Sequence, residues 1–256
     1  CLEVTTGIGT SNDDYRGFDI AYEQVSGDAI IVYSVGQNKP EYRIWNGSSW
    51  SAPDIAELPT GAYIRWVNLV TKPSSDTIML ITLDYGTYVS GAVWDGSQFG
   101  DSISLETSAP TSVYELMDAA WERSSGQCLV VWGKMVSTTG FVYYNSWDGS
   151  QWGSSAQGPS LGYKNDPNWL RLAPKPASDT MLVALGYDYV NTPRLATNLW
   201  DGSSWGMYQV HEADAMEAYD RRCFDITFES SGSQAILGWS DAGVHTLAVS
   251  YTHLTL

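Results

Sequence analysis

Residues able to bind a cation or a polar ligand recur at one point in each of five similar segments of the chain. They are Asp19, Asn68, Asp118, Arg171 and Asp225. Carboxylate oxygens are the ligands that a hard cation such as Ca²⁺ prefers, and an arginine among them could anchor a polar ligand. The alternative, which we favour, is that each aspartate bonds backbone groups of a neighbouring segment or faces water. A ligand site therefore requires a fold that brings these segments around one axis.

A second recurring set is aromatic. It consists of Trp50, Phe99, Trp152 and Trp205, each the last residue of a six-residue turn such as Trp-Asp-Gly-Ser-x-Trp. Sugars present apolar faces to aromatic rings, so these side chains could be glycan-stacking platforms. In the favoured alternative, the first aromatic residue of each turn is a core spacer and only the second is partly exposed. The first aromatic residues are Trp45, Trp94, Trp147 and Trp200.

The sequence offers little for catalysis. Residues 202–206 match the Gly-x-Ser-x-Gly nucleophile elbow, but that elbow requires a strand-to-helix turn, and two sister turns carry Gln in place of Ser204. No Ser-His-Asp triad and no histidine-rich metal site can be assembled from the histidines, which are His211, His245 and His253. We assign no catalytic residue, and we predict no cofactor apart from the Ca²⁺ considered above. Binding without catalysis is the stronger expectation.

The aromatic turns also reveal the organisation of the chain. They begin at residues 45, 94, 147 and 200, with spacings of 49, 53 and 53 residues. Self-similarity near fifty residues marks a repeat architecture. Asn-Gly or Asp-Gly between β-rich flanks predicts a hairpin tip with a type I′ turn, because Asn, Asp and Gly tolerate positive φ at both central residues. The elements that position the candidate residues are therefore strands.

Each repeat contains four short runs rich in β-branched and aromatic residues, as in residues 18–53. Such runs, separated by turn residues, predict a four-stranded antiparallel meander. The second run is almost continuously apolar, which indicates a strand buried on both faces. The predicted fold class is all-β: a β-propeller of four-stranded antiparallel blades, as a partial or truncated ring of about five blades. The first strand of each blade lines the central channel, which would bring Asp19 and its counterparts together.

We expect one repeat domain over residues 1–256. Residues 1–17 are assigned to the end of a preceding blade, residues 18–64, 65–114, 115–167 and 168–220 to complete repeats, and residues 221–248 to a partial repeat. Residues 249–256 resemble one reading frame of a sequencing adaptor and are assigned to a non-native tail; the alternative is a native terminal strand. The chain is expected to be a fragment of a longer propeller.

Odd and even repeats differ at the end of the first run. Repeats one, three and five carry Glu23, Glu122 and Glu229 there, whereas repeats two and four carry Lys72 and Lys175. Opposite charges at corresponding sites predict weak pairs between neighbouring blades that fix blade order. A closed ring that keeps this alternation would have an even number of blades.

Composition narrows the range of partners. The 13 Lys and Arg residues against 29 Asp and Glu residues give a net charge of −16, which opposes binding to nucleic acid or to anionic membranes. No apolar run is long enough for a transmembrane helix. Cys128 is predicted to be a buried hydrophobe, and a pairing of Cys1 with Cys223 stays open. Abundant Ser, Thr, Gly, Trp and Tyr favour an extracellular or cell-surface protein with a protein or glycan ligand.

The Trp-Asp-Gly-Ser-x-Trp turns, about fifty residues apart over nearly the whole chain, resemble the β-propeller-like repeats of bacterial and archaeal surface proteins. Weaker similarity extends to tachylectin-type lectins, through repeat length, and to the Asp-box turn of sialidase propellers, although here Gly directly follows Asp. The resemblance implies a non-enzymatic binding or scaffolding module that mediates protein interaction or adhesion. The alternatives are a lectin with sites between blades and a glycoside-processing enzyme, which would need two carboxylates in one cleft.

Overall fold

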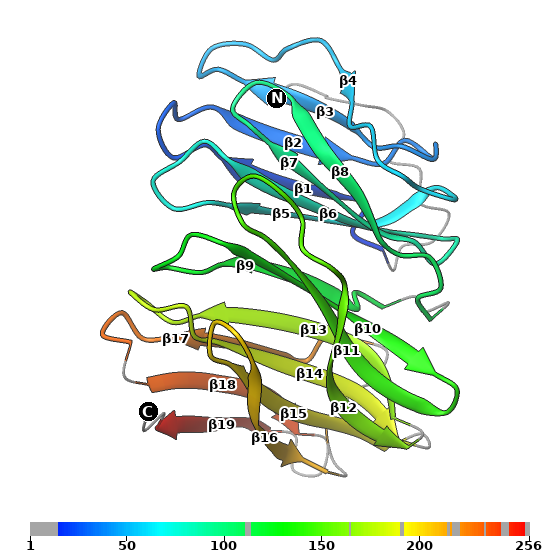
Figure 1. The fold of residues 1–256 in the computed structure, drawn as a ribbon, viewed down its shortest axis with the longest axis vertical. Helices are drawn as coiled ribbons and strands as arrows, with labels where there is room; N and C mark the ends of the chain where they lie inside the picture. Colours follow the sequence, from blue (N-terminus) through cyan, green and yellow to red (C-terminus); the bar gives the residue numbers. More distant parts are fainter. Residues whose placement is uncertain are drawn as a thin grey trace. The chain divides into compact units, whose positions relative to one another are not determined.

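The structure is a computed structural model that describes residues 15–110, 114–163, 165–189, 192–213, 216, 221–232, 234–241 and 246–253. These residues form strands and no helix, and every sheet is an antiparallel meander in which sequence neighbours pair. Four sheets have four strands and one has three. The prediction of an all-β fold built from propeller-like blades is confirmed (Figure 1).

We number the sheets as blades in chain order. Blade 1 contains β1 (Phe18–Tyr22), β2 (Ala29–Tyr33), β3 (Glu41–Trp45) and β4 (Asp54–Ile55). Blade 2 contains β5 (Ile64–Thr71), β6 (Ile78–Asp84), β7 (Val89–Trp94) and β8 (Phe99–Glu106). Blade 3 contains β9 (Met117–Trp121), β10 (Cys128–Val136), β11 (Thr139–Trp147) and β12 (Ala156–Tyr163). Blade 4 contains β13 (Asn165–Pro174), β14 (Met181–Tyr189), β15 (Thr192–Trp200) and β16 (Trp205–Glu212). Blade 5 contains β17 (Phe224–Phe228), β18 (Gln234–Asp241) and β19 (Thr246–His253).

The chain divides into two compact units, Cys1–Val113 and Tyr114–Leu256. Unit 1 holds blades 1 and 2, and its core lies between them, with Ile30 and Val32 of β2 against Leu69 of β5 and Leu80 of β6. Unit 2 holds blades 3 to 5. Its core lies between blades 3 and 4 and is made by the corresponding positions, listed as Leu129, Val131, Leu172 and Val183. In unit 2 the near-continuous apolar strand β14 is buried because blade 3 covers one side of blade 4 and blade 5 the other.

Register fixes which residues of the blades correspond. Ala29 of blade 1 pairs with Tyr22 on one side and Trp45 on the other, and Cys128 of blade 3 pairs with Trp121 and Trp147. Cys128 is fully buried, as predicted. The assigned repeat boundaries stay a prediction, as does the non-native tail, although residues 249–253 extend β19 and pair with β18.

The aromatic turns are hairpin tips, but the predicted type I′ geometry is wrong. The glycines have positive φ, for example 85° at Gly47 and 98° at Gly202, whereas Asn46 and Asp201 do not. The pairs Asn46-Gly47 and Asp201-Gly202 therefore lack the positive φ at both central residues that a type I′ turn requires. The Asn or Asp instead caps the turn from the side: Asp201 Oδ1 accepts hydrogen bonds from the Ser203 and Ser204 amides at 2.8 and 2.7 Å.

Glutamates at the ends of the first strands join odd blades to even ones, but their partner is not lysine. The indole Nε1 of Trp200 in blade 4 donates to Glu122 Oε1 of blade 3 at 2.8 Å, and Trp94 of blade 2 donates in the same way to Glu23 of blade 1. We call each of these contacts a Glu–Trp latch. The predicted Glu–Lys pairing is therefore corrected for both glutamates. An indole donor is preferred there because a buried carboxylate needs a hydrogen bond and a nearby apolar ring can supply one.

None of the described residues lies in a helix that could cross a membrane.

Candidate functional site

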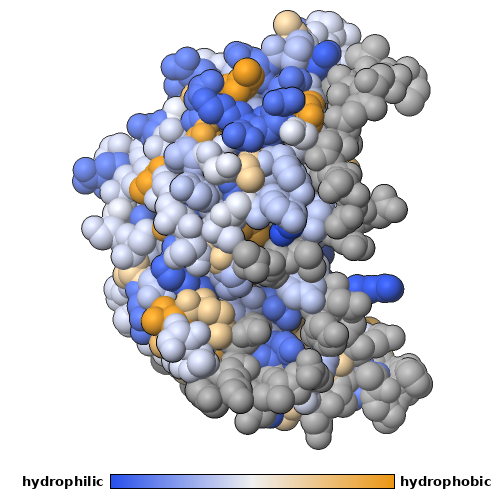
Figure 2. Space-filling view, turned by 90° about the vertical axis from the view of Figure 1, so that its right-hand side faces the viewer, coloured by the Kyte–Doolittle hydropathy of each residue, from blue (hydrophilic) through white to orange (hydrophobic). Residues whose placement is uncertain are grey.

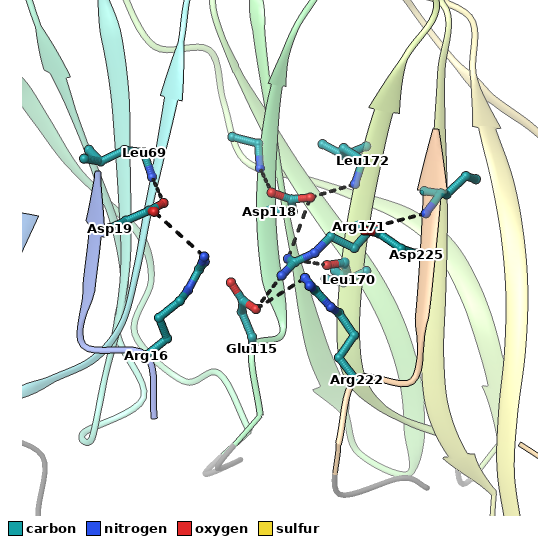
Figure 3. Close-up of polar contacts among 12 residues, drawn as sticks. Arg16, Asp19, Leu69, Glu115, Asp118, Leu170, Arg171, Leu172, Arg222 and Asp225 are labelled. Carbon is teal, nitrogen blue, oxygen red and sulfur yellow. Dashed lines mark hydrogen bonds and ion pairs between the residues drawn. The ribbon is translucent and has the colours of Figure 1, made fainter. Parts of the chain in front are cut away.

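The predicted ligand-binding aspartates bond the backbone of the next blade. Asp19 Oδ1 accepts from the Ile20 amide at 2.9 Å and its Oδ2 from the Leu69 amide of β5 at 2.8 Å. Asp118 repeats this arrangement in unit 2, with the Ala119 amide at 2.9 Å and the Leu172 amide of β13 at 2.7 Å (Figure 3). These geometries match the alternative favoured from the sequence, in which the aspartate docks one segment on its neighbour.

Unit 2 gathers charge around Arg171. The guanidinium Nη2 lies 2.6 Å from Glu115 Oε2, and Nη1 lies 3.9 Å from Asp118 Oδ2 and donates to the Leu170 carbonyl at 3.0 Å. Arg222, at the start of blade 5, brings its Nη1 to 4.0 Å from the same Glu115 oxygen. Figure 3 shows these side chains pointing toward one another: Arg171 comes from within β13, Asp118 from β9, and Glu115 and Arg222 from the segments that lead into β9 and β17. We call Glu115, Asp118, Arg171 and Arg222 the charge cluster.

Burial and neighbouring charges shift the pKa values of Asp118 and Arg171 in opposite directions. Burial raises the pKa of Asp118 to about 6, although Arg171 and the Leu172 amide oppose that rise. Burial lowers the pKa of Arg171, but the carboxylates of Asp118 and Glu115 outweigh it and leave that pKa raised. Arg171 is thus a cation held between two buried carboxylates, and desolvation makes Asp118 easier to neutralise than an exposed aspartate.

The remaining predicted site residues are divided between the units. Asn68 is buried in β5 of unit 1 with Asp19. Asp225 is exposed in β17 of unit 2, where it accepts from the Ile226 amide at 3.0 Å and contributes to the raised pKa of Arg171. Unit 2 therefore brings together Asp118, Arg171 and Asp225. Whether they bind a ligand stays a prediction.

Sequence reasoning missed Glu115 and Arg222. Each lies three residues before the aspartate of its repeat, as Arg16 lies three residues before Asp19, and Arg16 Nη1 is 3.9 Å from Asp19 Oδ1. A charged residue at this fixed offset in all three odd repeats was the available signal. It shows that the inner end of each odd blade carries a second charged residue.

The tip aromatics pack in pairs. Ring centroids are 5.5 Å apart for Trp45 and Trp50, 5.2 Å for Trp94 and Phe99, 5.5 Å for Trp147 and Trp152, and 5.2 Å for Trp200 and Trp205. The second aromatic of every turn is partly exposed, as expected. The first aromatics are buried in blades 2, 3 and 4, whereas Trp45 is partly exposed.

Even-blade tips have an additional contact. Phe99 lies 5.1 Å from the ring of Tyr42 in blade 1, and Trp205 lies 5.7 Å from the ring of Tyr144 in blade 3. These two aromatics therefore help to close the junction between blades. Trp50 and Trp152 of the odd blades are the better placed of the four for stacking on a sugar.

A cavity of about 570 Å³ opens in unit 2 between β13 and β17. Its wall exposes about as much polar as apolar surface: the side chains include Leu172, Pro174, Ile226 and Phe228, and the exposed Arg123 of the β9–β10 turn lies at it. We call this cavity the β13/β17 groove. Its volume lies in the range of small-ligand pockets, which are typically apolar with a few polar groups. On the face seen in Figure 2, hydrophobic residues otherwise form small separate patches among hydrophilic ones.

No three His, Cys, Asp or Glu side chains of the described part are grouped to hold a metal ion. Asp19 and Asp118 each accept two backbone amides instead. Binding of Ca²⁺ at Asp19, Asp118 and Asp225 stays a prediction.

Comparison with known proteins identifies the fold alone. No family model matches the chain, and no curated protein matches it. Solved structures similar to it include the Dos1 propeller, with TM-score 0.52 and 11% identity. The match covers 90% of this chain but only 56% of the length of the Dos1 propeller chain. A Kuenenia stuttgartiensis hydrazine synthase gives TM-score 0.57 and 12% identity, with 91% of this chain and 70% of that one covered. The Aleuria aurantia lectin, bound to Fucα1-6GlcNAc, gives 0.50 and 13%, with 93% and 76% covered. The chain has a β-propeller fold.

Proposed function

We propose that this chain is a non-enzymatic binding and scaffolding module, extracellular or at the cell surface, that mediates protein interaction or adhesion. The observation that carries the proposal is the β13/β17 groove, a cavity of about 570 Å³ with both apolar and polar surface, beside Arg123. The buried acidic residues also support a role without catalysis, because their partners belong to the chain itself. Asp118 and Glu122 hold blades together, and Glu115 is paired with Arg171.

The groove suits a partner segment with an apolar side chain next to a carboxylate. Leu172, Pro174, Ile226 and Phe228 provide the apolar wall, and burying one large apolar side chain contributes about 1.5–3 kcal/mol. Arg123 offers a planar cation that binds carboxylates in a bidentate manner.

The test uses the purified chain and a synthetic peptide library that pairs Leu, Phe or Ile with Asp or Glu, screened by biolayer interferometry. We expect Arg123→Ala to weaken the selected peptides by roughly tenfold, the size of one charge-assisted contact. Arg221→Ala, an exposed arginine of the same unit, is the matched control and is expected to bind normally. Equal binding by both variants and the parent would exclude the groove.

A lectin is the second candidate function, and the observation that favours it is the exposure of the odd-blade tips. Trp50 and Trp152 are partly exposed and backed by Trp45 and Trp147. On a glycan array, with and without Ca²⁺, Trp50→Ala and Trp152→Ala would abolish specific binding. Trp205→Ala would reduce folding stability first. Absence of glycan binding by the folded parent would reject the lectin.

A glycoside-processing role has less support, because Arg171 contacts both Glu115 and Asp118. Fluorogenic glycosides incubated with the parent are expected to give no turnover.

A further inference from the structure

One face of blade 5 corresponds, residue for residue, to faces that are covered in blades 1 and 3. We call this the forward face of an odd blade: it is the side that packs on the following even blade. Ala235 of blade 5 pairs with Phe228 and Thr252, as Cys128 of blade 3 pairs with Trp121 and Trp147. By this register Ile236 corresponds to Leu129, and Leu247 to Val142.

Burial differs sharply between the corresponding positions. Val142 of blade 3 is 0% exposed, whereas Leu247 of blade 5 is 75% exposed. Leu247 therefore presents apolar surface on a face that is a closed core in the other two odd blades.

The forward face of blade 5 also carries the two hydrogen-bonding groups of the other junctions. Asp225 stands where Asp118 accepts the Leu172 amide, and Glu229 stands where Glu122 accepts the indole of Trp200. Asp225 makes the same bond to its own following amide, from Ile226, that Asp118 makes to Ala119. Among the described residues, no backbone amide donates to the second oxygen of Asp225 as the Leu172 amide donates to Asp118.

The covered junctions define the chemistry of the partner. In both units the even blade presents a leucine amide to the aspartate, an indole N–H to the glutamate and an apolar sheet to the face between them. The even blades within this chain already use these groups on blades 1 and 3. A second copy of the chain therefore has no unoccupied even-blade surface of this kind to offer.

We infer that the forward face of blade 5 is a docking surface for a further even-type blade, one that donates a tryptophan indole to Glu229 and a backbone amide to Asp225. This inference concerns assembly and does not depend on the groove or on its ligand.

The test extends the chain with its own even blade. A second copy of residues 148–213 is joined after Thr252, which corresponds in register to Trp147. The added segment then supplies a fourth strand and an even blade after β19, as β12–β16 follow β11. Hydroxyl-radical footprinting by mass spectrometry reports the exposure of Leu247, and thermal unfolding reports stability. Two variants of the extended chain are compared: Glu229→Gln, and Trp→Phe at the appended copy of residue 200. The unextended chain is measured at two concentrations.

The expected result is a several-fold fall in the modification of Leu247 on extension, with a higher Tm that both variants reduce. Glu229→Gln in the unextended chain is expected to leave Leu247 as reactive as before. A folded extension that leaves Leu247 reactive would overturn the inference. An extension that stays protease-sensitive would also overturn it, because the face is inferred to be a sufficient template for the added blade. Protection of Leu247 that depends on concentration in the unextended chain would overturn it too, because it would identify a second copy as the occupant.

Discussion

Substitution of Glu122 or of Trp200 should destabilise unit 2. The effects of the two substitutions should overlap, because each removes the same hydrogen bond. Both side chains are buried, at 4% and 5% exposed, and the indole nitrogen lies 2.8 Å from the carboxylate. Burial raises the pKa of Glu122, and the hydrogen bonds from Ser125 and Trp200 oppose that rise without cancelling it. A hydrogen bond to a charged group contributes about 1.5–3 kcal/mol, and losing it leaves the carboxylate buried with fewer donors.

We therefore expect Trp200→Phe to cost about 2–4 kcal/mol, since it removes the donor and part of the buried ring. Glu122→Gln, which keeps one acceptor, should cost about 1–2 kcal/mol. The double variant should cost less than the sum by about 1–2 kcal/mol, the coupling expected for residues in contact. Each kcal/mol corresponds to a fall in Tm of about 2–4 °C for a chain of this size.

The assay is a double-mutant cycle by differential scanning calorimetry and urea unfolding. Unit 1 provides the matched cycle, Glu23→Gln with Trp94→Phe, because the same two atoms meet there. If the single effects add to within about 0.3 kcal/mol in both units, the latch is not a coupled contact and the reasoning is refuted.

Three further predictions follow from close contacts and buried charge. Gly202→Ala should cost about 1–2 kcal/mol, because the residue has φ 98°. Gly206→Ala, in open space directly after the turn, is the control in urea unfolding and should cost much less. Gly186→Ala should cost about 1–3 kcal/mol by overpacking, since a Cβ there would lie 2.7 Å from the Phe224 ring. Recovery of stability on adding Phe224→Leu would support this reason, and an unchanged urea midpoint for Gly186→Ala would contradict it. Asp118 has a folded pKa of about 6 against 3.8, so the folded state binds the extra proton, and acidification from pH 7 to 4 should add about 2 kcal/mol from this group. In Tm measurements over that pH range, the Asp118→Asn variant should lack this gain. Identical profiles of Tm against pH for the variant and the parent would contradict the prediction.

The fold could be predicted from the sequence because its signals are local and repeated. Apolar second strands, Asn-Gly or Asp-Gly tips and a period near fifty residues each predict the same antiparallel blade, and agreement between levels is what makes a sequence specific for one fold. Even the docking role of Asp19 and Asp118 could be anticipated, because a buried carboxylate needs donors and a neighbouring strand supplies amides.

The partners of Glu122 and Asp201 could not be predicted in the same way. Charge alternation suggested lysine for Glu122, but which atom of the next blade reaches a carboxylate depends on side-chain packing across the junction. The type I′ turn was wrong because the Asp201 side chain satisfies the amides of the loop, so only Gly202 needs positive φ. The β13/β17 groove left no pattern in the sequence, since its wall comes from three blades.

The bond from the Leu172 amide to Asp118 also constrains how such a chain can change length over generations. Unequal crossing-over between repeated stretches of DNA removes or adds whole repeats. Loss of a single repeat would place two odd blades together, so that two aspartates, such as Asp19 and Asp118, would compete for the one amide of Ala119. Loss or gain of two repeats would restore the odd–even order. The heritable unit of this architecture is therefore a pair of blades.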